Sequence, residues 1–350
     1  MARRLDDQAR LAWVHVYMSY YTRMIRRPVD AYPLASSVRG IAEKLGHVDL
    51  EIEADYELGM AHLFAGDHGG AQQLLLRACQ TGSTRLERPR GRAVTQLTAQ
   101  SYLGRSLAEC GHFKEGYTHG CQALRLAEQL DSPINIVIAR SELSNVHEIQ
   151  GEFDRAIPIL EGGLAVARDR ELTLLTAGVM GSLASAYAMA GRVNDGLAML
   201  DEALEPLEPT RLRPSQSHVV IKLSHVCLVG GRLGQARVLA THAVSLTREF
   251  GLRGWEAYAL RLLGEVWAYG AGPDVEKAEG HYRAALTLSQ QLGLRPLEAR
   301  CHLGLGGMLY RQHSRDREAQ EHLTIATTMC QQMNMRVGPA KAEGRSRELE

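Results

Sequence analysis

The sequence has no excess of charge of either sign and very little lysine. Forty basic residues balance forty acidic ones, so the formal net charge is zero, and only five of the basic residues are lysine. A balanced chain lacks the electrostatic footprint of general nucleic-acid or anionic-membrane binding. The arginine bias commonly accompanies GC-rich coding and therefore favours a bacterial source.

The chain also lacks redox and membrane signals. Its six cysteines form no C-x-x-C pair and lie within helical patterns beside small or apolar residues, as buried free thiols in a reducing cytosol would. No stretch approaches the ~20 apolar residues of a spanning helix, and residues 1–20 do not have the order of a signal peptide. We therefore expect a soluble, cytoplasmic protein without a membrane partner.

Catalytic, cofactor and metal motifs are missing as well. No G-x-x-x-x-G-K-[ST] phosphate loop occurs, and no nucleophile, base and orienting group can be identified together. His218 and His225 lie seven residues apart, with Cys227 nearby, whereas a metal site favours closer ligands and a third partner. The sequence predicts no enzyme activity, no cofactor and no metal.

What the sequence does contain is a repeat of about 40 residues. The anchor leucines recur at intervals of 45, 40, 40, 40 and 40, and they are Leu58, Leu103, Leu143, Leu183, Leu223 and Leu263. A glycine follows eight residues after each of the first five anchors, at Gly66, Gly111, Gly151, Gly191 and Gly231. A fixed period of this length is typical of stacked two-helix units, with the glycine in the turn between the two helices.

This register predicts an all-α solenoid that forms one domain over residues 1–335. About eight antiparallel hairpins are expected, at 5–45, 49–81, 93–130, 133–168, 172–207, 214–250, 254–292 and 295–333. Residues 336–350 lose apolar periodicity and are expected to form a flexible tail. A small residue follows each anchor, as at Gly104, Ala184 and Gly264, and we expect these residues where helices of adjacent hairpins approach closely.

The pattern resembles the tetratricopeptide repeat (TPR) in its longer, ~40-residue version. More specifically, the segments 254–265, 274–286 and 301–306 are similar to the carboxyl-terminal repeats of bacterial signalling proteins that carry a class III adenylate or guanylate cyclase domain and an AAA or STAND-type ATPase module. The resemblance implies a right-handed superhelix, a regulatory role and an associated cyclase or ATPase effector. It does not carry over the enzyme activity, since the catalytic motifs are absent.

In TPR superhelices the first helix of each hairpin lines the concave groove, so residues at offsets of −5, −2, +2 and +5 from the anchor share that face. These offsets give Glu53, Tyr56, Met60, Ser101, Arg105, Ser141, Asn145, Glu148, His218, His225, Tyr258, Arg261 and Glu265 as candidate groove residues. Arginine, asparagine and aromatic side chains are the types that hold peptides in grooves. A simply solvated concave face is equally expected for any single one of them.

The sequence therefore favours a non-catalytic scaffold or regulatory sensor module of a bacterial signalling system, with a protein or peptide partner. The alternative is the sensor domain of a transcription regulator that binds a peptide pheromone or a small metabolite. Self-association into a homodimer is a further expectation, because solenoid ends need polar caps and the first hairpin carries Trp13, Val16 and Tyr20.

Overall fold

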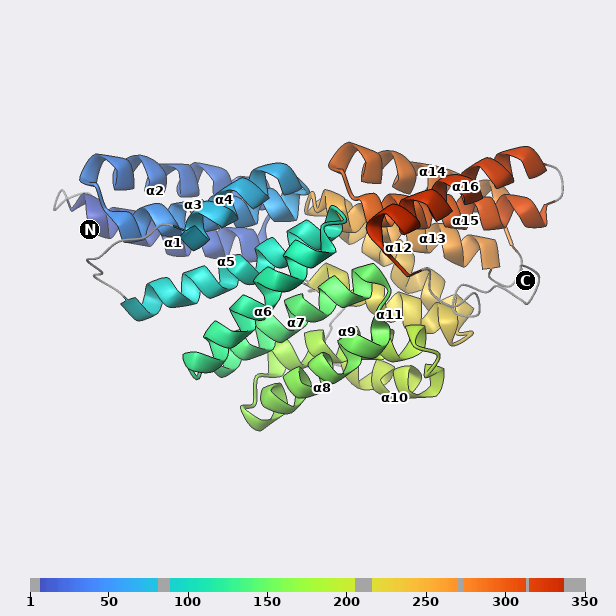
Figure 1. Ribbon diagram of the computed structural model, residues 1–350, viewed down its shortest axis with the longest axis horizontal. Coiled ribbons are helices and arrows are strands. Elements are labelled where there is room, and N and C mark those ends of the chain that lie inside the picture. The colour runs from blue at the N-terminus through green and yellow to red at the C-terminus, as the bar shows by residue number, and fades with distance from the viewer. Residues whose placement is uncertain (1–6, 81–88, 205–215, 270–272, 313–314, 337–350) are drawn as a thin grey trace.

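The computed structural model describes residues 7–80, 89–204, 216–269, 273–312 and 315–336. Over these residues the chain forms sixteen α-helices and one short 3-10 helix, with no β-strand (Figure 1). The prediction of an all-α helical solenoid is confirmed.

The helices alternate as first and second members of antiparallel hairpins. The first helices are α1 (Gln8–Ile25), α3 (Val48–Ala65), α5 (Pro89–Glu109), α7 (Pro133–Gln150), α9 (Thr173–Met189), α11 (Ser217–Val229), α13 (Arg253–Tyr269) and α15 (Arg295–Arg311). The second helices are α2 (Tyr32–Leu45), α4 (His68–Gln80), α6 (Phe113–Gln129), α8 (Phe153–Asp169), α10 (Val193–Leu204), α12 (Leu233–Glu249), α14 (Val275–Leu292) and α16 (Asp316–Met333). The 3-10 helix η2 (Pro28–Ala31) joins α1 to α2. Successive hairpins stack in chain order, so that α4 packs on α5, α8 on α9 and α12 on α13.

The periodic glycines form the turns inside the hairpins, as predicted. Gly66, Gly111, Gly151, Gly191 and Gly231 all have φ between 74° and 91°. Residues with a Cβ avoid this left-handed region, and glycine adopts it without steric cost. Five of the six anchor leucines are buried, with Leu103, Leu143, Leu183, Leu223 and Leu263 each 5% exposed or less, whereas Leu58 is half-buried.

The small residues after the anchors mark close backbone contacts, but not where the sequence placed them. A Cβ on Gly104 would lie 2.7 Å from the carbonyl oxygen of Gly116, and a Cβ on Gly116 would lie 2.6 Å from that of Gly104. Likewise, a Cβ on Gly196 would lie 2.7 Å from the carbonyl oxygen of Ala184. These pairs join the two helices of one hairpin, so the expectation of close contacts between adjacent hairpins is corrected.

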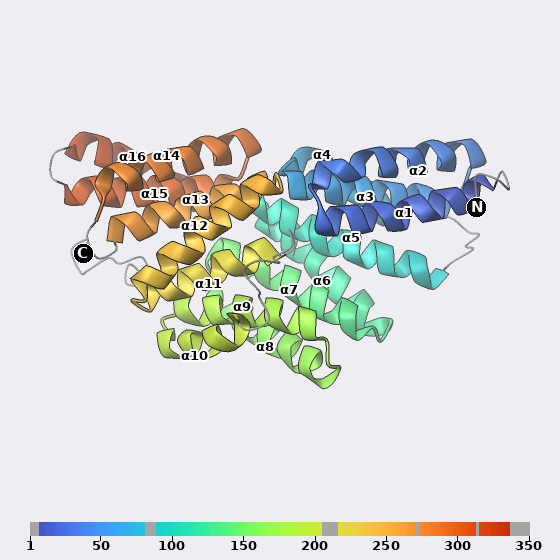
Figure 2. The ribbon, with the colours of Figure 1, turned by 180° about the vertical axis from the view of Figure 1, so that it is seen from behind.

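The solenoid coils far enough for early and late hairpins to meet. The turns at Gly66, Gly111 and Gly151 lie against Leu292, Met333 and Arg336, respectively. We call this contact between hairpins 2–4 and the segment 253–336 the closing seam. Figures 1 and 2 show the ends of the blue and orange hairpins meeting where the seam forms, and α3 contacts α13 there while α5 contacts α15.

The end of the described chain belongs to this seam. The backbone N–H of Arg336 donates to the carbonyl oxygen of Gln150 at 2.8 Å, and Gln150 Nε2 donates to the carbonyl oxygen of Asn334 at 3.0 Å. Arg336, the first residue of the predicted flexible tail, is therefore fixed to α7. Residues 337–350 of that tail lie outside the described residues.

Candidate functional site

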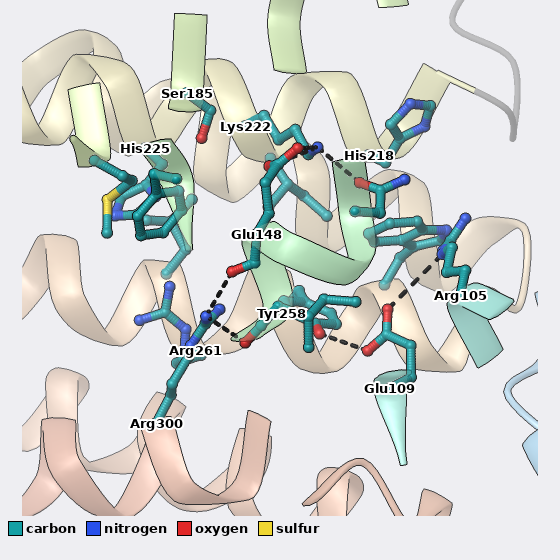
Figure 3. A pocket seen from close by; sticks show the side chains of 17 residues that line it. Arg105, Glu109, Glu148, Ser185, His218, Lys222, His225, Tyr258, Arg261 and Arg300 are labelled. Carbon is teal, nitrogen blue, oxygen red and sulfur yellow. Dashed lines mark hydrogen bonds and ion pairs between the residues drawn. The ribbon is translucent and has the colours of Figure 1, made fainter. Parts of the chain in front are cut away.

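A cavity of about 100 Å³ lies among the first helices of hairpins 3–8. Six first helices contribute side chains to it, namely α5, α7, α9, α11, α13 and α15, and the second helix α8 contributes Phe153 (Figure 3). The apolar part of its wall comes from Ile149, Phe153, Met189, Ile221 and Leu262. We call it the central cavity. Charged and aromatic side chains make up the rest of the wall.

Glu109 and Tyr258 form one side of the central cavity. Tyr258 Oη donates to Glu109 Oε2 at 2.5 Å, and Glu109 is only 4% exposed. Loss of hydration on burial raises the pKa of the Glu109 carboxyl above its ordinary value, although Arg105 and the tyrosine hydroxyl oppose that rise. Arg105 also lies over Trp255, with Cζ 4.4 Å from a ring centroid, which is a cation–π geometry.

Lys222 occupies the opposite wall, on α11. Its ammonium group donates to Glu148 Oε2 at 2.9 Å and to Asn145 Oδ1 at 3.0 Å (Figure 3). It also donates to Ser182 Oγ at 3.0 Å. An ammonium has three donors, and three acceptors from α7 and α9 surround this one. Lys222 thus fixes the carboxylate of Glu148, which is 8% exposed.

Arg300 links α15 to the carboxyl end of α7. Its Nη2 donates to the carbonyl oxygens of Glu148 at 3.0 Å and Ile149 at 2.9 Å. The last carbonyls of a helix lack hydrogen-bond partners within the helix and carry its partial negative charge. The Arg300 guanidinium supplies hydrogen-bond donors and an opposite charge at this position. This contact crosses the closing seam.

His225 and Arg261 form the remaining edge. Arg261 Nη1 lies 2.9 Å from Glu265 Oε2, so that this carboxylate is paired although it is 3% exposed. Loss of hydration lowers the pKa of His225 to about 4, and the nearby Arg261 and Arg300 lower it further while Glu265 opposes them. His225 is therefore neutral at pH 7, and its Nε2 has no hydrogen-bond partner among the described residues.

The aromatic residues of the central cavity form a small stack. The His218 ring lies on Trp255 at a centroid distance of 5.5 Å, and Trp255 contacts Tyr258 at 5.7 Å. The wall therefore combines flat aromatic surface with charged groups held in fixed pairs, which is an arrangement suited to binding.

Seven of the thirteen candidate residues line the central cavity. They are Arg105, Asn145, Glu148, His218, His225, Tyr258 and Arg261. Glu265 lines a smaller hollow next to it, together with His225, Arg261 and Arg300. The structure thus brings these eight residues together, while their role in binding remains a prediction.

Five candidates lie elsewhere. Met60 is 1% exposed and packs in a hydrophobic cluster with Tyr56 at its edge, and Ser101 is 1% exposed and donates to the carbonyl oxygen of Leu97. Ser141 Oγ donates to its own helix, and Glu53 accepts from Thr95. Met60 and Ser101 are buried, whereas Glu53 lines a separate hollow with residues of α1 and α5.

Four important wall residues were not among the candidates: Glu109, Lys222, Trp255 and Arg300. Lys222 and Glu109 sit at offsets of −1 and +6 from their anchors, and together with the +2 position these follow a spacing of three and four residues along one helix face. A wider range of offsets from the anchor would have included both Lys222 and Glu109. Trp255 and Arg300 reach the central cavity only because the late hairpins close onto the early ones.

The structure also bears on metal binding, membrane insertion and nucleophile chemistry. Within the described ranges no group of three or more His, Cys, Asp or Glu side chains could hold a metal ion, and no helix is long and apolar enough to cross a membrane. Beside the central cavity, His68 Nδ1 lies 3.0 Å from Ser106 Oγ. Ser106 is 0% exposed, so its hydroxyl is not open to a substrate.

No protein-family model matches the chain, and no curated protein matches it in sequence. Several solved structures match the chain in fold. The Rap conjugation gene regulator of plasmid pLS20, solved in complex with the Phr peptide, has a TM-score of 0.63 at 15% identity, covering 83% of this chain and 77% of that one. A Rap protein complexed with competence and sporulation factor has a TM-score of 0.64 at 12% identity, covering 87% and 81%. Cut9–Hcn1, an APC/C hetero-tetramer, has a TM-score of 0.57 at 14% identity, covering 92% and 54%. Similarity at these identities shows the fold, which is a TPR-like helical repeat.

Proposed function

We propose that the chain is a non-catalytic regulatory module that binds a peptide, or a peptide segment of a partner protein, at the central cavity. The observation that carries this proposal is the composition of the cavity wall. Apolar and aromatic surface from Ile221, Leu262 and Trp255 adjoins charged side chains that are already held in place, since Lys222 pairs with the Glu148 carboxylate and Arg300 donates to the last carbonyls of α7. A wall held in place before binding lowers the entropy cost of association.

The size of the central cavity limits what enters it. A volume of about 100 Å³ suits one side chain and not a chain of several residues. We therefore propose that a peptide inserts one apolar or aromatic anchor side chain beside Trp255 and Ile221. Anchors of this kind, buried in a pocket and surrounded by polar residues, commonly contribute most of the binding energy at an interface. The Rap regulator structure, which was solved in complex with the Phr peptide, supports peptide binding as the proposal to test first.

A peptide-display selection against the full chain tests the proposal, followed by isothermal titration of the enriched peptides. Ile221→Trp fills the central cavity, whereas Val238→Trp places the same side chain on α12, where Val238 is 68% exposed. We expect enriched peptides to lose at least about tenfold in affinity for Ile221→Trp, equivalent to about 1.4 kcal/mol, and to bind Val238→Trp unchanged. Equal binding to both variants would contradict the proposal.

A small metabolite is the second candidate ligand, because the central cavity is small and contains both cationic and aromatic groups. In that case the chain would be the sensor domain of a transcription regulator. Display selection would then give no peptide that competes with the metabolite, and a thermal-shift screen of cell metabolites would give a compound whose effect is lost in Ile221→Trp.

The effector is part of the same proposal. The resemblance to repeats of cyclase and ATPase signalling proteins makes a domain of that kind the partner that the module would regulate. Co-purification of the full chain with such a domain, and a change in the domain's nucleotide turnover on adding the chain, would support it. If neither is observed, the proposed peptide binding is unaffected, but the proposal of a cyclase or ATPase effector is contradicted.

A further inference from the structure

The hollow that Glu53 lines lies among the first helices of hairpins 1–3 and shares no lining residue with the central cavity. Its volume is about 250 Å³, and its residues come from α1, α3 and α5, whose places Figure 2 shows. We call it the amino hollow. Most of its wall is apolar or aromatic and comes from Trp13, Val16, Tyr17, Ile52 and Val94. The polar side chains of the wall are Asp49, Glu53, Arg92 and Thr95.

Two of these polar side chains are charged, buried and unpaired. Asp49 is 7% exposed, and Arg92 is 9% exposed. Among the described residues, neither side chain makes a hydrogen bond or an ion pair, and the two do not pair with each other although they line the same hollow. Glu53 differs, because Thr95 Oγ1 donates to its Oε1 at 2.7 Å. Buried charges are normally paired, since the loss of hydration is costly, so Asp49 and Arg92 need an explanation.

The positions of the two residues in their helices do not supply that explanation. Asp49 lies in the first turn of α3, where the partial positive charge of the helix end favours a carboxylate but leaves it without a hydrogen-bond donor. Arg92 lies near the start of α5, where the same partial charge disfavours a cation. Folding alone therefore gains little from either charge. A ligand that brings one group of each sign would satisfy both.

We propose that the amino hollow binds a free α-amino acid with an apolar or aromatic side chain. Its ammonium group donates to the Asp49 carboxylate, and its carboxylate accepts from the Arg92 guanidinium. Its side chain packs on the surface formed by Trp13, Val16 and Ile52. Apolar walls with a few charged groups that fix orientation are typical of small-molecule sites.

The chemistry of the charges favours a free amino acid over a peptide segment. Inside a peptide both α-groups are amides, so only the free molecule carries an ammonium and a carboxylate on one carbon atom. The volume of about 250 Å³ is at the small end of ligand pockets and suits one such molecule. This site is separate from the proposed peptide site, so either proposal can fail without the other.

Isothermal titration of the full chain with single amino acids tests the ligand class. The probes are L-leucine and L-phenylalanine, together with 2-phenylethylamine and 3-phenylpropionate, each of which lacks one of the two charges. We expect at least one amino acid to bind, and each single-charge analogue to bind at least about tenfold more weakly than phenylalanine. If neither amino acid binds, or if an analogue binds as tightly as phenylalanine, the proposal is overturned.

Variants test the location. Asp49→Asn and Arg92→Met should each weaken amino-acid binding at least about tenfold. Asp316→Asn is the matched control, because Asp316 also lies in the first turn of a helix but is exposed, and it should bind unchanged. Ile221→Trp, which fills the central cavity, should also bind the amino acid unchanged. Full binding by both Asp49→Asn and Arg92→Met would contradict the site.

Thermal melting without ligand separates a binding role from a structural one. Asp49→Asn removes an unpaired buried charge, so its melting temperature should equal or exceed that of the unchanged chain. Circular dichroism establishes that both variants are folded. A lower melting temperature for Asp49→Asn, together with retained amino-acid binding, would show that the carboxylate serves the fold and would overturn the proposal. A peptide from display selection whose binding requires Asp49 would assign the amino hollow to a peptide and also overturn it.

Discussion

Tyr258 Oη and Glu109 Oε2 lie 2.5 Å apart, although 149 residues separate them in the sequence. The hydrogen bond crosses the closing seam and joins hairpin 7 to hairpin 3. Repeat proteins are usually held together by contacts between neighbouring repeats, so a bond of this range is unusual for the class. It makes the shape of the central cavity depend on how the superhelix closes.

Replacing Tyr258 with phenylalanine tests the energetic weight of this bond. The variant leaves the buried Glu109 carboxyl without its hydroxyl donor, which should lower the free energy of unfolding by about 1–3 kcal/mol. Urea unfolding followed by circular dichroism measures the change. Tyr21→Phe, at a tyrosine that is 62% exposed, is the control and should unfold at the midpoint of the unchanged chain. Identical midpoints for both variants would show that the seam bond contributes nothing.

Lys222 should stabilise the chain through Glu148. Lys222→Met removes the ammonium and leaves a buried carboxylate unpaired, which should cost about 3 kcal/mol. Adding Glu148→Gln to the same chain should restore part of the loss, because the second change removes the unpaired charge. The exposed pair of Arg317 and Glu321 provides the comparison, since Arg317→Met should change the free energy of unfolding by less than about 1 kcal/mol. A double variant less stable than Lys222→Met would contradict the claim that Lys222 stabilises the chain by pairing with the Glu148 carboxylate.

The contact of Gly104 with Gly116 should not tolerate a methyl group. Gly104→Ala places a Cβ 2.7 Å from a backbone oxygen, and the resulting displacement of α5 from α6 should cost about 1–3 kcal/mol. Gly280 is also inside a helix but has open space around its missing Cβ, so Gly280→Ala should stabilise by about 0.5–1 kcal/mol. Thermal melts of the two variants should move in opposite directions. A shift in the same direction would exclude close packing as the cause.

Acidification should destabilise the chain through buried histidines. Burial lowers the pKa of His68 from its ordinary value of 6.5 to about 4, and Arg105 adds to the effect. Between pH 6.5 and 4 the unfolded chain therefore binds a proton that the folded chain does not, so this part of the stability is present above pH 6.5 and is lost as the pH falls. His68→Gln should lose less stability over that interval than the unchanged chain, whereas His112→Gln, at an exposed position, should behave like the unchanged chain. Equal losses for His68→Gln and the unchanged chain would contradict this assignment.

The repeat made most of the architecture predictable. Leucine recurs at a fixed period because it is buried where the two helices of a hairpin meet, and glycine follows eight residues later because the turn is left-handed. Leu183 and Gly191 therefore indicate their local structure without knowledge of the other repeats. The small residue after the anchor indicated a close contact but not its partner. Gly104 contacts Gly116 of its own hairpin, and a spacing pattern alone does not distinguish that partner from a neighbouring hairpin.

The site was less predictable because its walls come from distant repeats. Offsets along one helix found Asn145 and Tyr258, whose positions depend on local register. They did not find Arg300, which reaches α7 only across the closing seam. The accumulated twist of five hairpins decides where the seam forms, and small rotations per repeat leave no mark in the sequence.

Hydrogen–deuterium exchange of the full chain, with and without a peptide from the display selection, tests the central claim most directly. If a peptide binds at the central cavity, the amides of α5, α7, α11 and α13 should gain protection on binding, while those of α2, α6 and α10 should change little. Protection confined to second helices, or to α1 alone, would contradict the assignment of the central cavity as the binding site.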